Sequence, residues 1–206
     1  MNFNLSLWDT TEAKEYGEFE VLELGGHETK IVSAEEYTSE AGNTSLKICV
    51  DISGSEKQKG FFTEQYKKNP NADKKWSSGA TRYLSLKDEN LAYLKGFITA
   101  LENSNNGFKF NKSGEWKQLV GLKIASVFGL EEYKKEDGSI GARTRLTQFR
   151  SLDKLKSIKI PAVKTIDGDY IDYEEYKEIR NDRNGVSTTI TSEDSNMVEI
   201  TDDFLD

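Results

Sequence analysis

Short segments in which apolar and polar residues alternate recur along the chain, and they constrain its fold more than any other feature. Residues two apart in a β-strand share a face, so this alternation predicts strands with one buried and one exposed side. Gly25-Gly26 is expected to end the first strand, and Asp137-Gly138 predicts a tight hairpin between the last two. The predicted strand segments are 17–24, 29–37, 45–52, 82–86, 115–120, 122–133 and 142–150.

One segment follows a helical pattern instead. Its apolar residues recur at helical spacing between Leu91 and Leu101, and Asp88 precedes them as a helix cap. The spacing predicts a helix over about 88–102, which the Asn-rich and Gly-containing segment 103–107 ends. Short strands with one inserted helix favour a mainly β fold built as an antiparallel barrel like the oligonucleotide-binding (OB) fold. A β-sandwich is the alternative.

Composition divides the chain into three parts. Hydrophobic residues make up 35% of the chain and charged residues 31%, which is more polar than a fully packed chain of this length. We predict an N-terminal arm at 1–16, an OB-fold-like domain at 17–165, and an acidic, largely disordered tail at 166–206.

The net charge of −8 conceals an uneven distribution along the sequence. Residues 1–36 carry a net charge of −7 and residues 167–206 carry −10, whereas residues 37–166 hold 23 basic and 14 acidic residues, a net +9. A cationic central region favours a polyanionic partner, and it is separate in sequence from the acidic ends. An ordinary lysine-rich solvated surface is the alternative explanation.

Basic and aromatic residues are concentrated in the segment 57–83. Trp76 follows two lysines within a loop rich in Asn, Ser and Gly, which is a poor place for a core residue. Binding of single-stranded nucleic acid needs cations for the phosphates and flat rings on which bases stack. By alternation, Arg143, Arg145 and Phe149 are expected on one face of the last strand. The predicted nucleic-acid-binding residues are Lys57, Lys59, Phe62, Tyr66, Lys67, Lys68, Lys74, Lys75, Trp76, Arg82, Arg143 and Arg145.

The chain contains no recognisable catalytic or cofactor-binding motif. With one cysteine (Cys49) and one histidine (His27), neither a disulfide framework nor a thiolate or imidazole zinc site is expected. Glu115 and Lys117 have the Glu-x-Lys spacing of some metal-dependent nucleases, but a match of three residues is not specific. We therefore predict no enzymatic activity, no cofactor and no metal, and a nuclease centred on Glu115 and Lys117 is an alternative.

The end of the chain predicts a second kind of contact. Residues 197–206 place apolar side chains among acids at the tip of the predicted tail. Such a tip is suited to insert its apolar side chains into a pocket of a partner protein while its carboxylates meet surrounding basic residues. The predicted partner-binding residues are Asp202, Asp203, Phe204 and Leu205. A tail that only adds solubility is the alternative.

Neither end of the chain carries a membrane or export signal. No apolar run reaches the roughly 20 residues that a membrane-spanning helix needs. The N-terminus has neither the basic stretch nor the apolar centre of a signal peptide. We expect a cytoplasmic protein that has no membrane partner.

Five segments, together with a Ser/Thr-rich acidic linker and an Asp-Asp-apolar tip, carry a resemblance to a known family. The segments are 31–35, 73–76, 121–133, 149–155 and 159–161. With the tail they cover most of the chain, and they resemble the bacterial single-stranded-DNA-binding proteins. The narrower resemblance is to the phage- and prophage-encoded versions from Gram-positive bacteria. That family usually ends in Asp-Asp-Asp-Leu/Ile-Pro-Phe, whereas this chain ends in Asp-Asp-Phe-Leu-Asp.

The resemblance implies an OB fold and service in phage DNA replication or recombination, within the cytoplasm of the host cell. It also implies replication or recombination proteins as partners of the acidic tip, and it allows self-association into a homo-oligomer. The leading hypothesis is a non-catalytic protein that coats single-stranded DNA. Besides the nuclease, a phage protein-interaction module that binds no nucleic acid is the remaining alternative.

Overall fold

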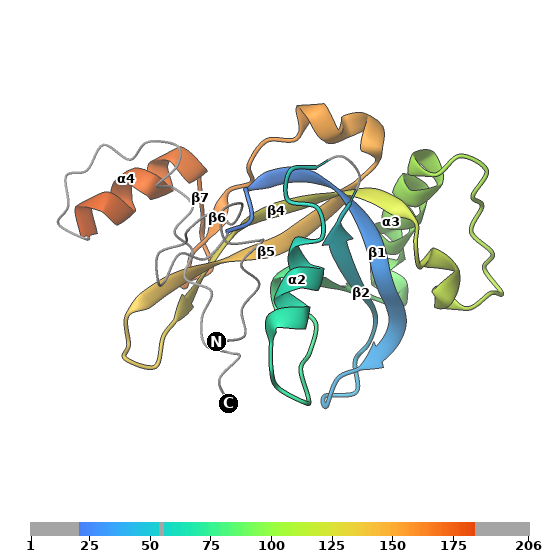
Figure 1. Ribbon diagram of the computed structural model, residues 1–206, viewed down its shortest axis with the longest axis horizontal. Coiled ribbons are helices and arrows are strands. Elements are labelled where there is room, and N and C mark those ends of the chain that lie inside the picture. The colour runs from blue at the N-terminus through green and yellow to red at the C-terminus, as the bar shows by residue number, and fades with distance from the viewer. Residues whose placement is uncertain (1–20, 54–55, 184–206) are drawn as a thin grey trace, which may run out of the picture.

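Most of the alternating segments form strands of a single sheet (Figure 1). The computed structural model describes residues 21–53 and 56–183. The sheet has seven strands in the order β3-β2-β1-β4-β6-β7, with β5 paired to β4, and every pairing but β4–β6 is antiparallel. The strands are β1 (Gly25–Thr38), β2 (Thr44–Ile52), β3 (Thr81–Ser85), β4 (Lys123–Lys134), β5 (Ile140–Arg150), β6 (Val163–Lys164) and β7 (Tyr170–Ile171).

Helices cover this sheet and connect its strands. The described α-helices are α2 (Phe61–Lys68), α3 (Leu91–Ser104) and α4 (Tyr173–Arg183). The 3₁₀ turns are η1 (Ser78–Ala80), η2 (Asp88–Asn90), η3 (Trp116–Leu119) and η4 (Leu152–Ser157). In Figure 1, α3 lies at one end of the sheet, α4 lies at the other, and α2 lies between them.

The main core lies beneath β1, β2 and β4. Leu46, Ile48 and Val50 of β2 are almost completely buried, as are Ile124 and Phe128 of β4. The predicted helix over 88–102 is confirmed with small shifts at its ends, because η2 precedes α3 and α3 runs to Ser104. Its residues Phe97, Ala100 and Leu101 supply the face that packs on this core.

Gly25-Gly26 begins strand β1 and does not end a strand over 17–24, so this prediction was wrong. Residues 21–24 form no strand, and residues 17–20 lie outside the described residues. Gly25 and Gly26 pair with Phe128 and Val127 of β4. A Cβ atom on Gly26 would lie 2.9 Å from side-chain atoms of Ile158. The missing side chain therefore allows the chain after η4 to pack closely on β1, and it does not break the strand.

The predicted strand over 115–120 instead contains the helical turn η3, and the aromatic segment that follows residue 60 forms α2. The buried carboxylate of Asp51 accepts hydrogen bonds from the Phe62 N–H at 3.0 Å and from the Thr63 hydroxyl. These bonds satisfy polar groups of the first helical turn, so both Phe61 and Phe62 turn into the core.

The β4–β5 hairpin is confirmed, but one residue changes its alternation. The Asp137-Gly138 turn closes with a hydrogen bond from the Gly138 N–H to the Lys135 carbonyl, and Gly138 has a φ of 81°. Phe128 pairs with Leu146 and Val127 pairs with Gln148, so Thr147 is an extra residue in β5. This bulge reverses the alternation, and Phe149 packs against Phe97 at 4.8 Å between ring centroids. The prediction that Phe149 shares a face with Arg143 and Arg145 was therefore wrong.

The folded part of the chain continues past residue 165, where we predicted its end. Val163 of β6, together with Tyr173 and Tyr176 of α4, forms a second buried cluster with Leu130 and Ala142. The arm at 1–16 and the tail beyond residue 183 lie outside the described residues. No helix of the described segments is long and apolar enough to span a membrane.

The sheet is open rather than closed into a barrel. The helix α3 lies between β3 and β4 in the chain, as expected for the predicted inserted helix. The strands β3 and β5 approach each other through η1, where the Ser78 carbonyl accepts a hydrogen bond from Arg145 at 3.4 Å. Within 21–53 and 56–183, however, no residue of β3 pairs with β5. The mainly β prediction is confirmed, and the OB-fold-like barrel is not.

The docking of α4 can be tested by comparing two tyrosines. We expect Tyr176→Ala to lower the free energy of unfolding by about 3 kcal/mol, because it opens a cavity beside Leu130 and Val163. Tyr170→Ala is the control, since that side chain is 70% exposed and Tyr176 is 4% exposed. Urea denaturation followed by circular dichroism measures both. Equal stability of the two variants would contradict the docking of α4.

Candidate nucleic-acid interface

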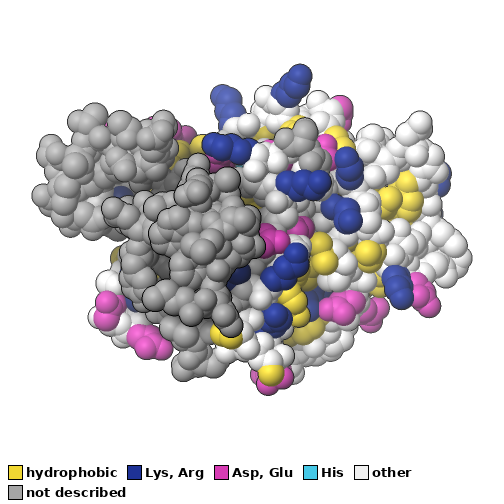
Figure 2. Space-filling view, in the orientation of Figure 1, with side chains coloured by type: hydrophobic (Ala, Val, Ile, Leu, Met, Phe, Trp, Pro, Cys, Tyr) yellow, Lys and Arg dark blue, Asp and Glu magenta, His cyan; other side chains and the backbone are white. Residues whose placement is uncertain are grey.

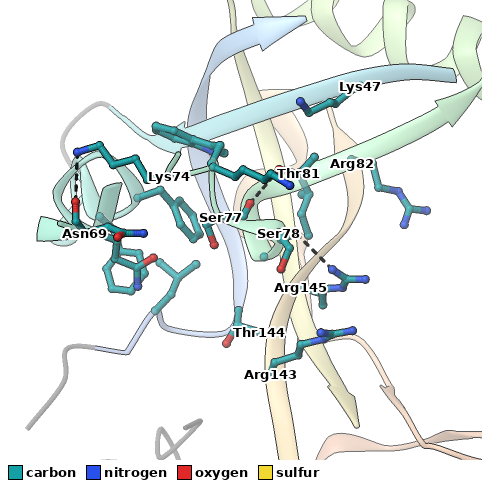
Figure 3. A pocket seen from close by; sticks show the side chains of 18 of the residues that line it. Lys47, Asn69, Lys74, Ser77, Ser78, Thr81, Arg82, Arg143, Thr144 and Arg145 are labelled. Carbon is teal, nitrogen blue, oxygen red and sulfur yellow. Dashed lines mark hydrogen bonds between the residues drawn. The ribbon is translucent and has the colours of Figure 1, made fainter. Parts of the chain in front are cut away.

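A hollow of about 980 Å³ lies between α2, the loop after it, η1, β3 and the edge of β5 (Figure 3). We call it the basic cleft, because six cationic side chains line it and Asp73 is the one acidic residue in its lining among the residues that the structure describes. The cations come from four separate parts of the chain, which the fold brings together. They are Lys47, Lys74, Lys75, Arg82, Arg143 and Arg145.

One wall of the cleft is the loop that carries Trp76. The indole N–H of Trp76 donates a hydrogen bond to the Val50 carbonyl at 3.2 Å, and its ring lies 5.7 Å from that of Tyr66. The ammonium group of Lys74 lies 4.7 Å from the centre of the Tyr66 ring and donates to the Asn69 carbonyl. Trp76 is half-buried. These contacts fix the loop, so its lysines are held at the cleft and not on a free segment.

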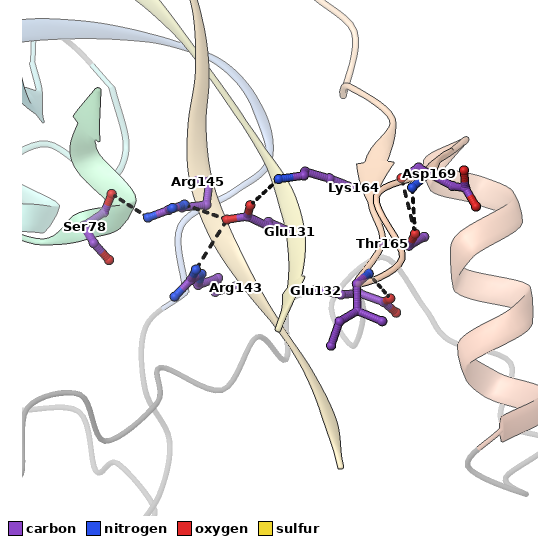
Figure 4. A network of polar contacts seen from close by, with 9 residues as sticks. Ser78, Glu131, Glu132, Arg143, Arg145, Lys164, Thr165 and Asp169 are labelled. Carbon is purple, nitrogen blue, oxygen red and sulfur yellow. Dashed lines mark hydrogen bonds and ion pairs between the residues drawn. The ribbon is translucent and has the colours of Figure 1, made fainter. Parts of the chain in front are cut away.

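The opposite wall is organised by one carboxylate (Figure 4). Glu131 of β4 accepts from Arg145 at 2.8 Å and from Lys164 at 3.1 Å, and it lies 3.5 Å from Arg143. Burial, which opposes ionisation, is the largest influence on Glu131. The Lys164 hydrogen bond and the three positive charges outweigh it and hold the pKa of Glu131 below its usual value. Three cations share one anion here, so this wall keeps a positive excess.

Arg143 and its neighbour also have unused hydrogen-bonding capacity. Among the described residues, the Nε of Arg143 and the hydroxyl of Thr144 are buried polar atoms without a hydrogen-bond partner. Both residues line the basic cleft. A buried donor without a partner is costly, so these two groups add to the cost of holding the cleft.

Arg82 lies beside Arg145 (Figure 3), without a carboxylate at ion-pair distance among the described residues. Its side chain is exposed, but flanking groups remove part of its hydration. This desolvation, together with the positive charge of Arg145, lowers the pKa of Arg82 from its usual value. Two guanidinium groups that repel each other are a favourable place for an anion.

Exposed rings stand beside these cations. Tyr83 of β3 lines the cleft and is 48% exposed, and its ring lies 5.3 Å from that of Tyr37 on β1. Lys47 is the partner of Tyr83 in the β2–β3 register. Figure 2 shows Lys and Arg side chains gathered with hydrophobic ones over the middle of this face. The list of predicted binding residues omitted both tyrosines, although Tyr83 lies in the basic, aromatic segment 57–83; only strand pairing reveals Tyr37 as its neighbour.

The structure brings together seven of the twelve residues predicted to bind nucleic acid. The residues that line the basic cleft are Phe62, Lys74, Lys75, Trp76, Arg82, Arg143 and Arg145, and Tyr66 supports its wall. Four others are exposed but lie outside the cleft, namely Lys57, Lys59, Lys67 and Lys68. The prediction that Phe62 binds nucleic acid was wrong. Its side chain is only 4% exposed, because the start of α2 directs it into the core, so it offers no surface for stacking.

The residues predicted for a nuclease and for partner binding lie outside the basic cleft or outside the described residues. Glu115 and Lys117 are exposed at η3 and do not line the basic cleft. Among the described residues, no group of three or more His, Cys, Asp and Glu side chains could hold a metal ion. Asp202, Asp203, Phe204 and Leu205, the predicted partner-binding residues, lie outside the described residues.

Comparison with known proteins adds no identification. No model of a protein family matches the chain, and no curated protein matches it in sequence. The resemblance of the sequence to single-stranded-DNA-binding proteins therefore stays a prediction.

The Glu131 network predicts a specific pH dependence. Because the pKa of Glu131 is lowered by folding, its contribution to stability is fully present above its usual value of 4.5 and is lost as the pH falls through the lowered pKa. We expect Glu131→Gln to cost on the order of 1 kcal/mol of unfolding free energy at neutral pH, and the difference from the unsubstituted protein to shrink in acid. Urea denaturation between about pH 7 and pH 3 measures this difference.

Glu35→Gln provides the matched control. Glu35 is 56% exposed and its carboxylate pairs with the single cation Lys47, whereas Glu131 is 19% exposed and binds three cations. We expect a smaller loss of stability from Glu35→Gln. A Glu131→Gln difference that stays constant with pH would show that the ionised carboxylate does not organise this wall.

Proposed function

We propose that this chain binds single-stranded DNA without catalysing a reaction on it. One observation carries the proposal: six cationic side chains and one acidic side chain line the basic cleft, and an exposed tyrosine stands at its edge. Cations neutralise phosphates and release their counterions, which supplies affinity without regard to base sequence. An exposed ring stacks on a base, which also tolerates any sequence.

The geometry of the rings favours a single strand over a duplex. Tyr83 and Tyr37 present their rings on the outer side of β1 and β3, beside the basic cleft. The bases of a duplex are already stacked and paired inside the helix, so their faces cannot reach such rings. Unpaired bases can turn onto them while the phosphates follow the cations.

The order of elements supports an OB-fold-like interpretation. The strands β1, β2 and β3 form an antiparallel meander, α3 follows β3, and β4 returns to pair with β1 before β5 pairs with β4. This connectivity agrees with the expected barrel with one inserted helix, and such barrels commonly bind oligonucleotides. Service in phage DNA replication or recombination, with proteins recruited through the acidic tip at 202–205, is the corresponding biological proposal.

Arg82 provides the sharpest test of phosphate binding. For single strands, the logarithm of the binding constant falls with the logarithm of salt concentration by about 0.7 for each phosphate contact. We expect Arg82→Gln to weaken binding to an oligothymidylate and to lower this slope by about 0.7. Fluorescence anisotropy across a salt series measures both quantities.

Lys57→Gln is the control for this measurement. It removes the same unit of charge from an exposed position outside the basic cleft. Equal salt slopes for the two variants would mean that total charge, and not the cleft, determines binding. A labelled strand cut in the presence of Mg²⁺, with cleavage lost in Glu115→Ala, would instead favour the nuclease hypothesis.

Tyr83 tests base stacking separately from charge. Tyr83→Ala removes an exposed ring, so we expect it to weaken binding by about 1–3 kcal/mol while the salt slope stays unchanged. Tyr83→Phe keeps the ring and should bind nearly as well as the unsubstituted protein. Unchanged affinity of Tyr83→Ala would show that no base stacks on Tyr83.

A further inference from the structure

A second hollow, of about 500 Å³, lies between α3, β3 and the end of β5 that follows the bulge. We call it the α3 groove. The helix contributes Ala92, Tyr93, Gly96 and Ala100, and β5 contributes Phe149 and Arg150. Arg82 of β3 and Lys154 of η4 also line it.

The α3 groove and the basic cleft meet at one residue. Arg82 lines both hollows, and it is the one described residue that they share. Its position on β3 faces the region where β3 and β5 are unpaired. The two hollows are therefore consecutive along the β3–β5 boundary, with a guanidinium at their junction.

The side chains of the α3 groove suit a polyanion with flat apolar parts. Arg82, Arg150 and Lys154 line it, and no described acidic residue does. The ring of Tyr93 is 74% exposed, which makes it the most exposed large hydrophobic side chain among the described residues. An exposed aromatic ring beside cations is the same combination that the basic cleft presents through Tyr83.

We propose that a bound single strand continues from the basic cleft, past Arg82, into the α3 groove. This inference rests on the proposed function and extends its site beyond the predicted residues. The phosphates would pass Arg82 toward Arg150 and Lys154, and a base would stack on Tyr93. A strand long enough to fill both hollows gains these contacts, and a short oligonucleotide held in the basic cleft does not.

Continuity favours nucleic acid over an acidic peptide in this groove. A peptide with acidic and apolar side chains would also find cations and an apolar floor. However, Arg82 lines both hollows, so a single polyanion that occupies both keeps its contact with Arg82 as it passes from one to the other. A separate peptide in the groove would compete with the strand for Arg82 and would lower its affinity.

Gly96 allows the groove to be blocked without disturbing the core. It lies in the middle of α3, and a Cβ atom there would meet no heavy atom within 4 Å. Glycine is the weakest helix former after proline, so a side chain at this position favours the helix. We choose Gly96→Glu to place a negative charge in the groove and Gly96→Gln as the neutral control of the same size.

The test compares oligothymidylates of about 5 and about 20 nucleotides, lengths near the lower end of and above the range of about 4–16 nucleotides bound by one OB fold. We expect Gly96→Glu to weaken binding of the longer strand about fivefold relative to Gly96→Gln, and to leave the shorter strand unchanged. Anisotropy titrations at low salt provide the affinities. Thermal denaturation of both variants confirms that they are folded.

Each remaining outcome has a definite meaning. Equal binding of the longer strand by both variants would overturn the continuation into the α3 groove while leaving the basic cleft as the site. No binding of either strand by the unsubstituted protein would refute the proposed function itself. Tighter DNA binding by both variants would indicate that the groove normally holds a competing acidic segment, and this too would overturn the inference.

Discussion

Strand β4 is the constraint on which the rest of the structure depends, because both of its edges are paired. One edge pairs with β1 over its first half and with β6 farther on, while the other edge pairs with β5 along nearly its whole length. Phe128 belongs to the main core, and Leu130, two residues later, belongs to the cluster that holds α4. Glu131, directly after Leu130, organises the cations of the basic cleft. The strand β4 thus connects the core, the α4 cluster and the proposed site.

The basic cleft has an electrostatic cost that packing offsets. Arg82 and Arg145 repel each other, and Glu131 compensates only part of the charge of the three cations that it binds. Like charges held close together weaken the folded state, so a fold retains them more readily where binding of an anion relieves the repulsion. The surrounding contacts, such as the Trp76 hydrogen bond to Val50, hold the cleft in place without a ligand.

Local patterns in the sequence predicted the elements whose signals are local. The alternation at 45–52, the Asp137-Gly138 turn and the helical spacing before Leu101 all correspond to observed elements. Predictions failed where a distant residue decides the outcome. Asp51 stabilises the start of α2 from ten positions before Phe61. The bulge at Thr147 becomes visible only when β5 is paired with β4, and it moves Phe149 to the other face.

The same reasoning explains which site residues could be found. Clustered lysines and arginines are visible in the sequence, and seven of the twelve predicted residues do line one cleft. Tyr83 belongs to the basic, aromatic segment 57–83, but its neighbour Tyr37 is far away in the sequence and reaches it only through two strand pairings. The polar segment at 173–183 was predicted to belong to the disordered tail, yet Tyr173 and Tyr176, three residues apart on α4, are enough to bury one helical face.

A net charge of −8 is compatible with a polyanionic ligand, because distance limits how far charges act. At physiological ionic strength, the field of an exposed charge decays over about 8 Å. A phosphate in the basic cleft therefore responds to the six cations that line it far more than to acidic residues elsewhere on the surface. Under the proposed function, overall charge affects the approach of DNA from a distance, whereas a bound strand responds to the local excess. Affinity for DNA and net charge are then separate properties, and the arrangement of side chains along the β3–β5 boundary would determine the affinity.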